Sequence, residues 1–141
     1  MTDVNPWIRE WTPEWSNAVF RLEERELRWN KVRRLMARDG IDVIIGLPNT
    51  HNYDRAQADS RYLTQLGENA DETTVAFPLD GNVTAWLSRG GVWPGSNWVG
   101  DIRPQVRGGG GATITSWLNE NPYYQTATIA IAGLTASPLS H

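Results

Sequence analysis

The side chains best suited to bind a metal ion lie in one polar stretch of the sequence. His51 is followed by Asp54, Asp59 and Asp71. A zinc site needs two or more nitrogen or sulfur ligands, and a hard-metal site needs several converging carboxylates. One histidine and dispersed aspartates meet neither requirement. The sequence therefore predicts no metal site in this chain, and Asp54 and Asp59 are more typical of turns.

Nucleophilic catalysis has equally little support. The chain contains no cysteine and no Gly-x-Ser-x-Gly motif, and Ser60 lies near His51 in sequence only. A glycine run, Gly108–Gly111, precedes a predicted helix and could present backbone amides to a phosphate. It lacks a convincing preceding strand, the G-x-G-x-x-G spacing and a following Lys-Ser/Thr pair. We interpret the run as a flexible joint, with a nucleotide-binding loop as the alternative.

Tryptophans could form a platform on which flat ligands stack. Trp86, Trp93 and Trp98 lie close to Arg89 in the sequence. Such platforms bind nucleic acid when positive charge surrounds them. The chain instead carries 13 Lys+Arg against 16 Asp+Glu, a net charge of −3. We therefore predict no nucleic-acid partner, and expect Trp86 in the core and Trp93 and Trp98 over a loop or an interface.

Length and composition predict one domain with a substantial core. The chain has 141 residues, of which 40% are hydrophobic. The absence of cysteine excludes disulfide scaffolds, iron–sulfur clusters and thiol nucleophiles. The first 15 residues lack a basic patch followed by an apolar run, so no secretory signal is predicted. Ile41–Leu47, the longest apolar stretch, is too short to cross a bilayer. We expect a cytoplasmic protein with no membrane partner.

The clearest predicted element is a helix over residues 21–39. Five apolar residues recur at intervals of three, four and seven: Leu22, Trp29, Val32, Leu35 and Met36. Acidic residues come early and basic residues late, which complements the helix dipole. Glu24 and Arg28 are spaced to form an ion pair. Gly40 is placed to end the helix in a left-handed conformation.

The following segments alternate between strands and helices. Ile41–Leu47 is predicted as a strand covered on both faces, and Ser60–Thr64 as a short helical turn. Two strands flanking Asp80-Gly81 form a predicted hairpin. A strand over Trp98–Ile102, a helix over 113–119 and a strand over 125–132 complete the series. This order predicts an α/β domain with a mixed sheet of about five strands flanked by helices.

The N-terminal segment is predicted to be an arm that contacts another surface. Trp7, Trp11 and Trp15 are spaced by four, so their rings would share one side of a helix. We expect them to pack on the domain itself or on a neighbouring subunit, and we treat them as candidates for an oligomer contact. The predicted organisation is an arm over residues 1–20, a domain over 21–134 and the start of a linker over 135–141.

Three stretches together resemble one family. Leu27–Met36, followed by Gly40–Ile45, resembles the opening helix and first strand of the creatinase/prolidase N-terminal domain. Asp59–Thr64 resembles that domain's Asn-Ile-Arg-Tyr-Leu-Thr-Gly turn, and Val75–Gly81 its following hairpin. The order and spacing of the three stretches carry the likeness, which covers most of the chain. The resemblance implies a ribonuclease H-like fold.

The resemblance implies that the domain precedes a "pita-bread" catalytic domain. In that domain two Asp, one His and two Glu bind two divalent metal ions. Xaa-Pro aminopeptidases and prolidases of this M24-type family cleave before proline there, whereas creatinase and some lyases share the architecture. The expected partners are the chain's own C-terminal catalytic domain and further copies in a homodimer or homo-tetramer. The expected metal, Mn, Co or Zn, would belong to the catalytic domain, and no catalytic residue is assigned here.

The resemblance also implies that loops of this domain reach the partner subunit's active site. Here the corresponding positions are residues 67–72 and 88–93. The family's closing glycine is shifted by two, to Gly67, and the first loop is acidic. Such a loop would attract a cationic or amine group, although a solvated acidic loop is the alternative. The candidates for shaping substrate access are Arg61, Tyr62, Glu68, Asp71, Glu72, Arg89 and Trp93. A stand-alone ligand- or nucleotide-binding module remains the alternative function.

Overall fold

The computed structural model describes residues 22–47, 58–66, 73–88, 98–106 and 109–132. Within these residues the elements, in chain order, are α1 (Leu22–Asp39), β1 (Val43–Gly46), α2 (Ala58–Thr64), β2 (Thr73–Pro78), β3 (Thr84–Leu87), β4 (Asp101–Pro104), α3 (Gly109–Glu120), the 3-10 helix η3 (Pro122–Thr126) and β5 (Ile129–Ala132).

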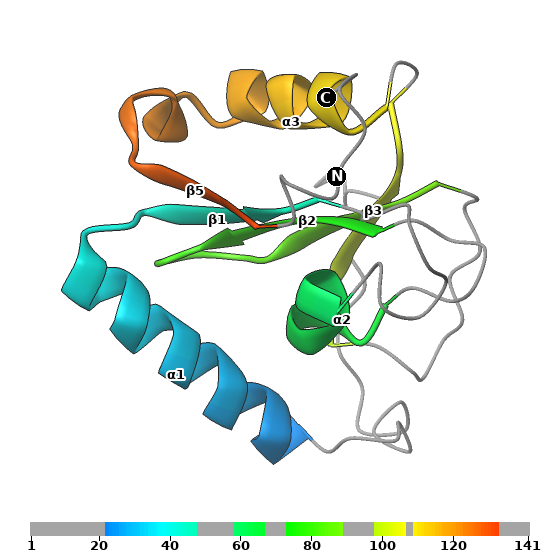
Figure 1. Cartoon of the computed structure of the whole chain (residues 1–141). Helices are drawn as coiled ribbons and strands as arrows, with labels where there is room; N and C mark the ends of the chain where they lie inside the picture. The colour runs from blue at the N-terminus through cyan, green and yellow to red at the C-terminus, as the bar shows by residue number, and fades with distance from the viewer. Residues whose placement is uncertain (1–21, 48–57, 67–72, 89–97, 107–108, 133–141) are drawn as a thin grey trace, which may run out of the picture.

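The strands form one mixed sheet in the order β4-β3-β2-β1-β5. β1, β2 and β3 are successive antiparallel neighbours, whereas β5 runs parallel to β1 and β4 runs parallel to β3. Figure 1 shows α1 and α2 on one face of the sheet and α3 on the other. The predicted α/β fold with a five-stranded mixed sheet flanked by helices is thus confirmed.

Helix α1 follows the sequence prediction closely. Its ion pair joins Arg28 Nε to a carboxylate oxygen of Glu24 at 2.8 Å, as the spacing predicted. Gly40 ends the helix with φ +67°, a conformation that costs glycine little because it has no Cβ. Met36 is 1% exposed and Trp29 packs on the core. The prediction for Leu35 was wrong: its side chain is 43% exposed, at the edge of the apolar stripe.

Strand β1 lies inside the sheet and is covered from both faces, as predicted. Val43 and Ile45 face the α3 side, whereas Ile44 packs with the core on the α1 side. Gly46 is required by close packing, since a Cβ there would lie 2.7 Å from Val75 Cγ1 and 3.2 Å from Ser60 Oγ. β2 and β3 form the predicted hairpin.

Three boundaries differ from the sequence prediction. The strand expected over Trp98–Ile102 is β4, which begins only at Asp101. The last strand is confined to β5, because Pro122–Thr126 forms a 3-10 helix that starts at a proline. The run Gly108–Gly111 is not a flexible joint where the structure describes it, because Gly109–Gly111 is the first turn of α3.

Two apolar cores lie on opposite faces of the sheet. The core on the α1 and α2 side includes Met36, Leu63 and Phe77, all at most 5% exposed. The core on the α3 side is built around Trp86 and Trp117, whose rings meet edge to face at 6.5 Å. Within the described residues, no helix has both the length and the apolar character to cross a membrane.

Candidate functional site

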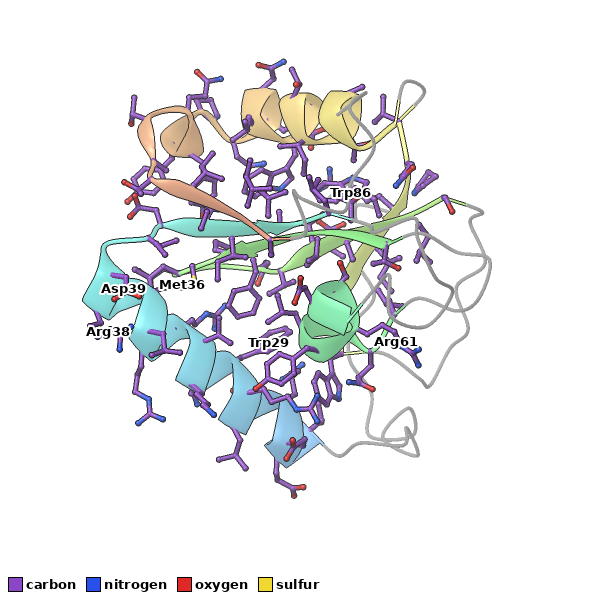
Figure 2. All side chains as sticks on the ribbon, in the orientation of Figure 1. Trp29, Met36, Arg38, Asp39, Arg61 and Trp86 are labelled. Carbon is purple, nitrogen blue, oxygen red and sulfur yellow. The ribbon has the colours of Figure 1, made fainter. Side chains whose placement is uncertain are left out.

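Helix α2 carries the only two predicted site residues that the structure describes. Its pattern of burial separates an inner from an outer side. Ser60 and Thr64 are fully buried and Leu63 is 5% exposed, whereas Arg61 is exposed and the Tyr62 ring is 40% exposed. Figure 2 shows Arg61 on the outer side of α2, pointing away from α1. The short helix therefore presents a cation and an aromatic ring on its surface.

Hydrogen bonds fix the orientation of α2 on the sheet. The buried Ser60 hydroxyl donates to the Thr73 carbonyl at the start of β2 over 3.0 Å. The Thr64 hydroxyl donates to the Ser60 carbonyl at 2.7 Å, and the Leu66 N–H donates to the Thr64 Oγ1 at 3.0 Å. These bonds satisfy buried hydroxyl groups that would otherwise lose their water partners. The inner side of α2 is consequently rigidly placed.

The carbonyl groups at the end of α2 also find partners from distant elements. Trp29 Nε1 of α1 donates to the Leu63 carbonyl at 2.8 Å. The Trp98 N–H donates to the Thr64 carbonyl at 2.9 Å. Gln65 adopts φ +58°, so the chain leaves the helix in the left-handed region. Three separate parts of the sequence thus meet at this end of α2.

A stacked group connects α1 to the outer side of α2. The Arg28 guanidinium lies 4.7 Å from the Tyr62 ring centre and 5.2 Å from the Trp98 ring centre. Its Nε donates to Glu24 at 2.8 Å, so the charge is compensated along α1. A cation over an aromatic face is attracted to the electron-rich ring. We call Arg28, Arg61 and Tyr62 the cation–aromatic surface; the Trp98 ring, which is fully buried, packs on Arg28 but is not exposed on it.

Chemically, this surface carries groups suited to recognition of a ligand. Arg61 supplies guanidinium donors that match a carboxylate, and Tyr62 supplies a partly exposed aromatic face on the same helix. Arg28 holds that face through its stacking and its pair with Glu24. Within the described residues no three His, Cys, Asp or Glu side chains gather as potential metal ligands.

Most predicted site residues lie outside the part of the chain that the structure describes. Arg61 and Tyr62 are successive residues of α2, which is the helical turn predicted from the sequence. The other substrate-access candidates, Glu68, Asp71, Glu72, Arg89 and Trp93, and the arm residues Trp7, Trp11 and Trp15 lie outside the described residues.

The structure corrects the interpretation of the tryptophans. Trp86 is 2% exposed and belongs to the core, as predicted. Trp98, expected to cover a loop or an interface, is instead fully buried, and its ring lies on the α1 side. Trp86 packs on the α3 side, above the sheet in Figure 2. These two rings therefore cannot form a common stacking platform.

A hollow with a volume of about 320 Å³ lies between β4 and α3. It is lined by Trp86, Arg103, Thr113, Ser116, Trp117 and Glu120, among others. Its cation is already engaged: Arg103 donates to both Asp101 oxygens at 2.9 Å and to Glu120 at 2.6 Å. The hydrogen bond with Asp101, followed by that with Glu120, raises the Arg103 pKa against the opposing effect of burial. The hollow therefore offers a ligand little charge.

The glycine-rich start of α3 borders this hollow but is closed by its own bonds. The Val106 N–H donates to Thr113 Oγ1 at 3.1 Å, and the Thr113 hydroxyl donates to the Gly109 carbonyl at 2.8 Å. Thr113 is fully buried. Of the glycines at the helix start, Gly109 has φ +85°, a conformation that favours glycine.

Sequence reasoning missed the contribution of Arg28 to the cation–aromatic surface. Arg28 was predicted only as an ion-pair partner of Glu24, and Trp98 was considered for a stacking platform and expected to cover a loop or an interface. The signal available in the sequence was the placement of arginine beside tryptophan in Arg28-Trp29, which does not identify the distant rings. Their proximity comes from the packing of α1, α2 and the segment before β4.

Comparison with known proteins identifies no family to which the chain can be assigned: no family model matches it, and no curated sequence is significantly similar.

Proposed function

We propose that this chain is the non-catalytic N-terminal domain of a creatinase/Xaa-Pro peptidase-type hydrolase of the M24 kind. In this proposal it contributes to oligomerisation and shapes substrate access to a metal-dependent site in a C-terminal domain. The observation that carries the proposal is α2. The segment that resembles the family's turn buries Ser60, Leu63 and Thr64 and exposes Arg61 and Tyr62.

The chemistry of the exposed pair supports a role in substrate access. A guanidinium binds carboxylates, such as the C-terminus of a short peptide, through paired N–H donors. Tyr62 is the next residue of the same helix, and the Arg28 guanidinium of α1 lies 4.7 Å from the centre of its ring. An apolar ring packs well on a proline side chain. Arg61 and Tyr62 together therefore suit a short peptide with a free carboxylate.

The proposal extends to partners and location. The expected partners are the chain's own catalytic domain and further copies in a homodimer or homo-tetramer, in the cytoplasm. Mn, Co or Zn would be bound by the catalytic domain. Creatinase-like hydrolysis and lyase chemistry on small sulfonium compounds are the alternative activities of a parent with this front domain.

The first test is the reading frame of the gene beyond the codon for His141. We expect it to continue into a domain with two Asp, one His and two Glu as metal ligands. A stop codon directly after His141 would overturn the proposal. It would favour the alternative of a stand-alone ligand- or nucleotide-binding module.

The second test uses the full-length parent and an Xaa-Pro peptide. We expect Arg61→Ala to lower kcat/KM about tenfold, equal to about 1.4 kcal/mol of lost transition-state binding. Arg34→Ala, an exposed arginine on α1, is the matched control and should leave kcat/KM unchanged. Equal activity of both variants would show that Arg61 takes no part in substrate access.

A further inference from the structure

Strand β5 ends the sheet with an edge that has no charged residue. Its sequence is Ile-Ala-Ile-Ala, and each of its four residues is at least partly exposed. The Ile131 side chain is 50% exposed. Within the described residues β5 pairs only with β1. An uncharged apolar edge strand is a template for pairing with another strand, which most proteins prevent with charges or proline.

The backbone groups that face outward from β5 can be identified. The Thr128 carbonyl accepts from the N–H groups of Asp42 and Val43, and the Ala132 carbonyl accepts from Leu47. Residues 128 and 132 thus point their backbone groups toward β1. Because this direction alternates along a strand, Ile129 and Ile131 point their N–H and C=O groups away from the sheet.

The opposite edge of the sheet is protected. The Gln105 N–H donates to the Leu87 carbonyl, so the backbone groups of Gln105 point toward β3. By the same alternation, the backbone groups of Pro104 point outward. Proline has no N–H to offer a further strand. Arg103 and Asp101 add charge along β4. Among the described residues, one edge of the sheet is therefore blocked and the other is able to pair.

We propose that β5 pairs with β5 of a second copy of this chain, antiparallel across a two-fold axis at Ala130. This register matches Ile129 of each copy with Ile131 of the other, and each such pair exchanges both N–H···O bonds. It rests on the oligomerisation included in the proposed function. The strand has no charge, so the two-fold axis brings no like charges together. The small Ala130 side chains meet on the axis, where non-hydrogen-bonded partners approach most closely.

A cysteine cross-link tests this register in the full chain. The protein has no cysteine, so introduced thiols have no competitor. Cα atoms of a non-hydrogen-bonded pair lie about 4.5 Å apart, which permits a disulfide. We expect Ala130→Cys to form a disulfide dimer under mild oxidation. Ala132→Cys is the matched control: it lies on the same face of β5, about 13 Å from its own copy, and should stay monomeric on a non-reducing gel.

Two further measurements separate the edge from other dimer contacts. Ile131→Pro removes an outward N–H, whereas Ile131→Ala keeps it. In sedimentation, the dissociation constant of the dimer should therefore be at least tenfold higher for Ile131→Pro than for Ile131→Ala. In wild-type protein, hydrogen exchange of the Ile129 and Ile131 amides should slow as the dimer forms. Equal cross-linking of both cysteine variants, or of neither, would overturn the proposal.

The other possible results of the hydrogen-exchange measurement also test the proposal. Slow exchange of both amides in a monomer would mean that another part of the same chain covers the edge, and would overturn the proposal. So would fast exchange in a dimer, because another surface would then carry the contact. These results are independent of the reading frame beyond His141. A β5 dimer from a gene that ends there would overturn the proposed function alone.

Discussion

The two outer strands end the same sheet by different means. β4 carries Asp101, Arg103 and Pro104, and its charges form a network with Thr84 of β3 and Glu120 of α3. β5 carries only isoleucine and alanine, and apolar packing and backbone bonds to β1 hold it. Both strands have four residues and a parallel neighbour. The difference shows that exposure to solvent alone does not decide how a sheet edge is built.

The centre of the sheet provides the reference for both edges. β1 and β2 are buried from both sides, and each edge strand reaches this centre directly or through β3. A change at the centre should therefore affect both edges, whereas a change at one edge should affect that edge first. The predictions below run from the largest expected effect to the smallest.

The largest effect is expected from Phe77→Ala in β2. Phe77 is fully buried, meets Trp29 edge to face at 5.6 Å and lies under the Arg33 guanidinium at 5.1 Å. The cavity should lower the free energy of unfolding by about 3–5 kcal/mol, measured by urea denaturation. Leu27→Ala, at a 67% exposed position, is the control and should change it by less than about 0.5 kcal/mol. Loss of amide protection at only one edge strand would contradict this shared dependence.

The second effect concerns the charged edge. Arg103→Ala leaves Asp101, whose side chain is 10% exposed, without its guanidinium. We expect a loss of about 2–3 kcal/mol in the free energy of unfolding, because an unpaired buried carboxylate is costly. Arg103→Lys should recover less than half of that free energy, since an ammonium cannot bind both carboxylate oxygens of Asp101 in a planar fork. Arg38→Ala removes an exposed pair with Asp39 and should leave Tm unchanged.

The third prediction concerns Tyr124, which anchors the 3-10 helix η3 before β5. The Tyr124 hydroxyl donates to the Asp80 carbonyl at 3.0 Å, and its ring stacks on Trp117 at 5.0 Å. Desolvation, with smaller contributions from Tyr123 and Asp80, raises the pKa of Tyr124. The folded state therefore holds this proton more tightly than the unfolded state. The resulting stability is present below the unfolded pKa of about 10 and is lost as pH rises through the folded pKa.

Tyr124→Phe should therefore cost about 1 kcal/mol at pH 7, from the lost hydrogen bond. It should also flatten the decline of stability above about pH 10, in urea denaturation followed between pH 7 and 11. Parallel curves for the variant and the wild type would show that Tyr124 does not cause the alkaline sensitivity.

The smallest effect on the isolated chain is expected at the open edge. Ile131→Lys gives β5, at its third residue, a charge like that of Arg103 at the third residue of β4. Because Ile131 is half exposed, the free energy of unfolding of the monomer should fall by less than about 1 kcal/mol. Self-association should nevertheless be lost in sedimentation, since an edge lysine disfavours strand addition. A dimer that persists would show that the edges do not differ in the way we infer.

Local patterns were sufficient to predict the elements that depend on neighbouring residues. The apolar spacing from Leu22 to Met36 and the glycine at position 40 defined α1, and Asp80-Gly81 located the hairpin. Arg61 and Tyr62 were chosen as site candidates because their segment resembles a family's turn, and only the structure shows that both are exposed. The clustering of Arg28 with the Tyr62 and Trp98 rings could not be predicted, because the three residues are separated by 34 and 36 positions along the chain.

What the sequence determined by itself was the alternation of helix and strand, the ends set by Gly40 and Pro122, and the fold class. Only the tertiary structure decided that Gly109–Gly111 begins a helix, that Trp98 is buried and that β4 starts at Asp101. Glycine is a poor helix former, by about 1 kcal/mol per residue. The buried Thr113 and Trp117 of the same helix outweigh that preference through packing on the sheet. Local propensities are small, so contacts between distant residues decide wherever the two disagree.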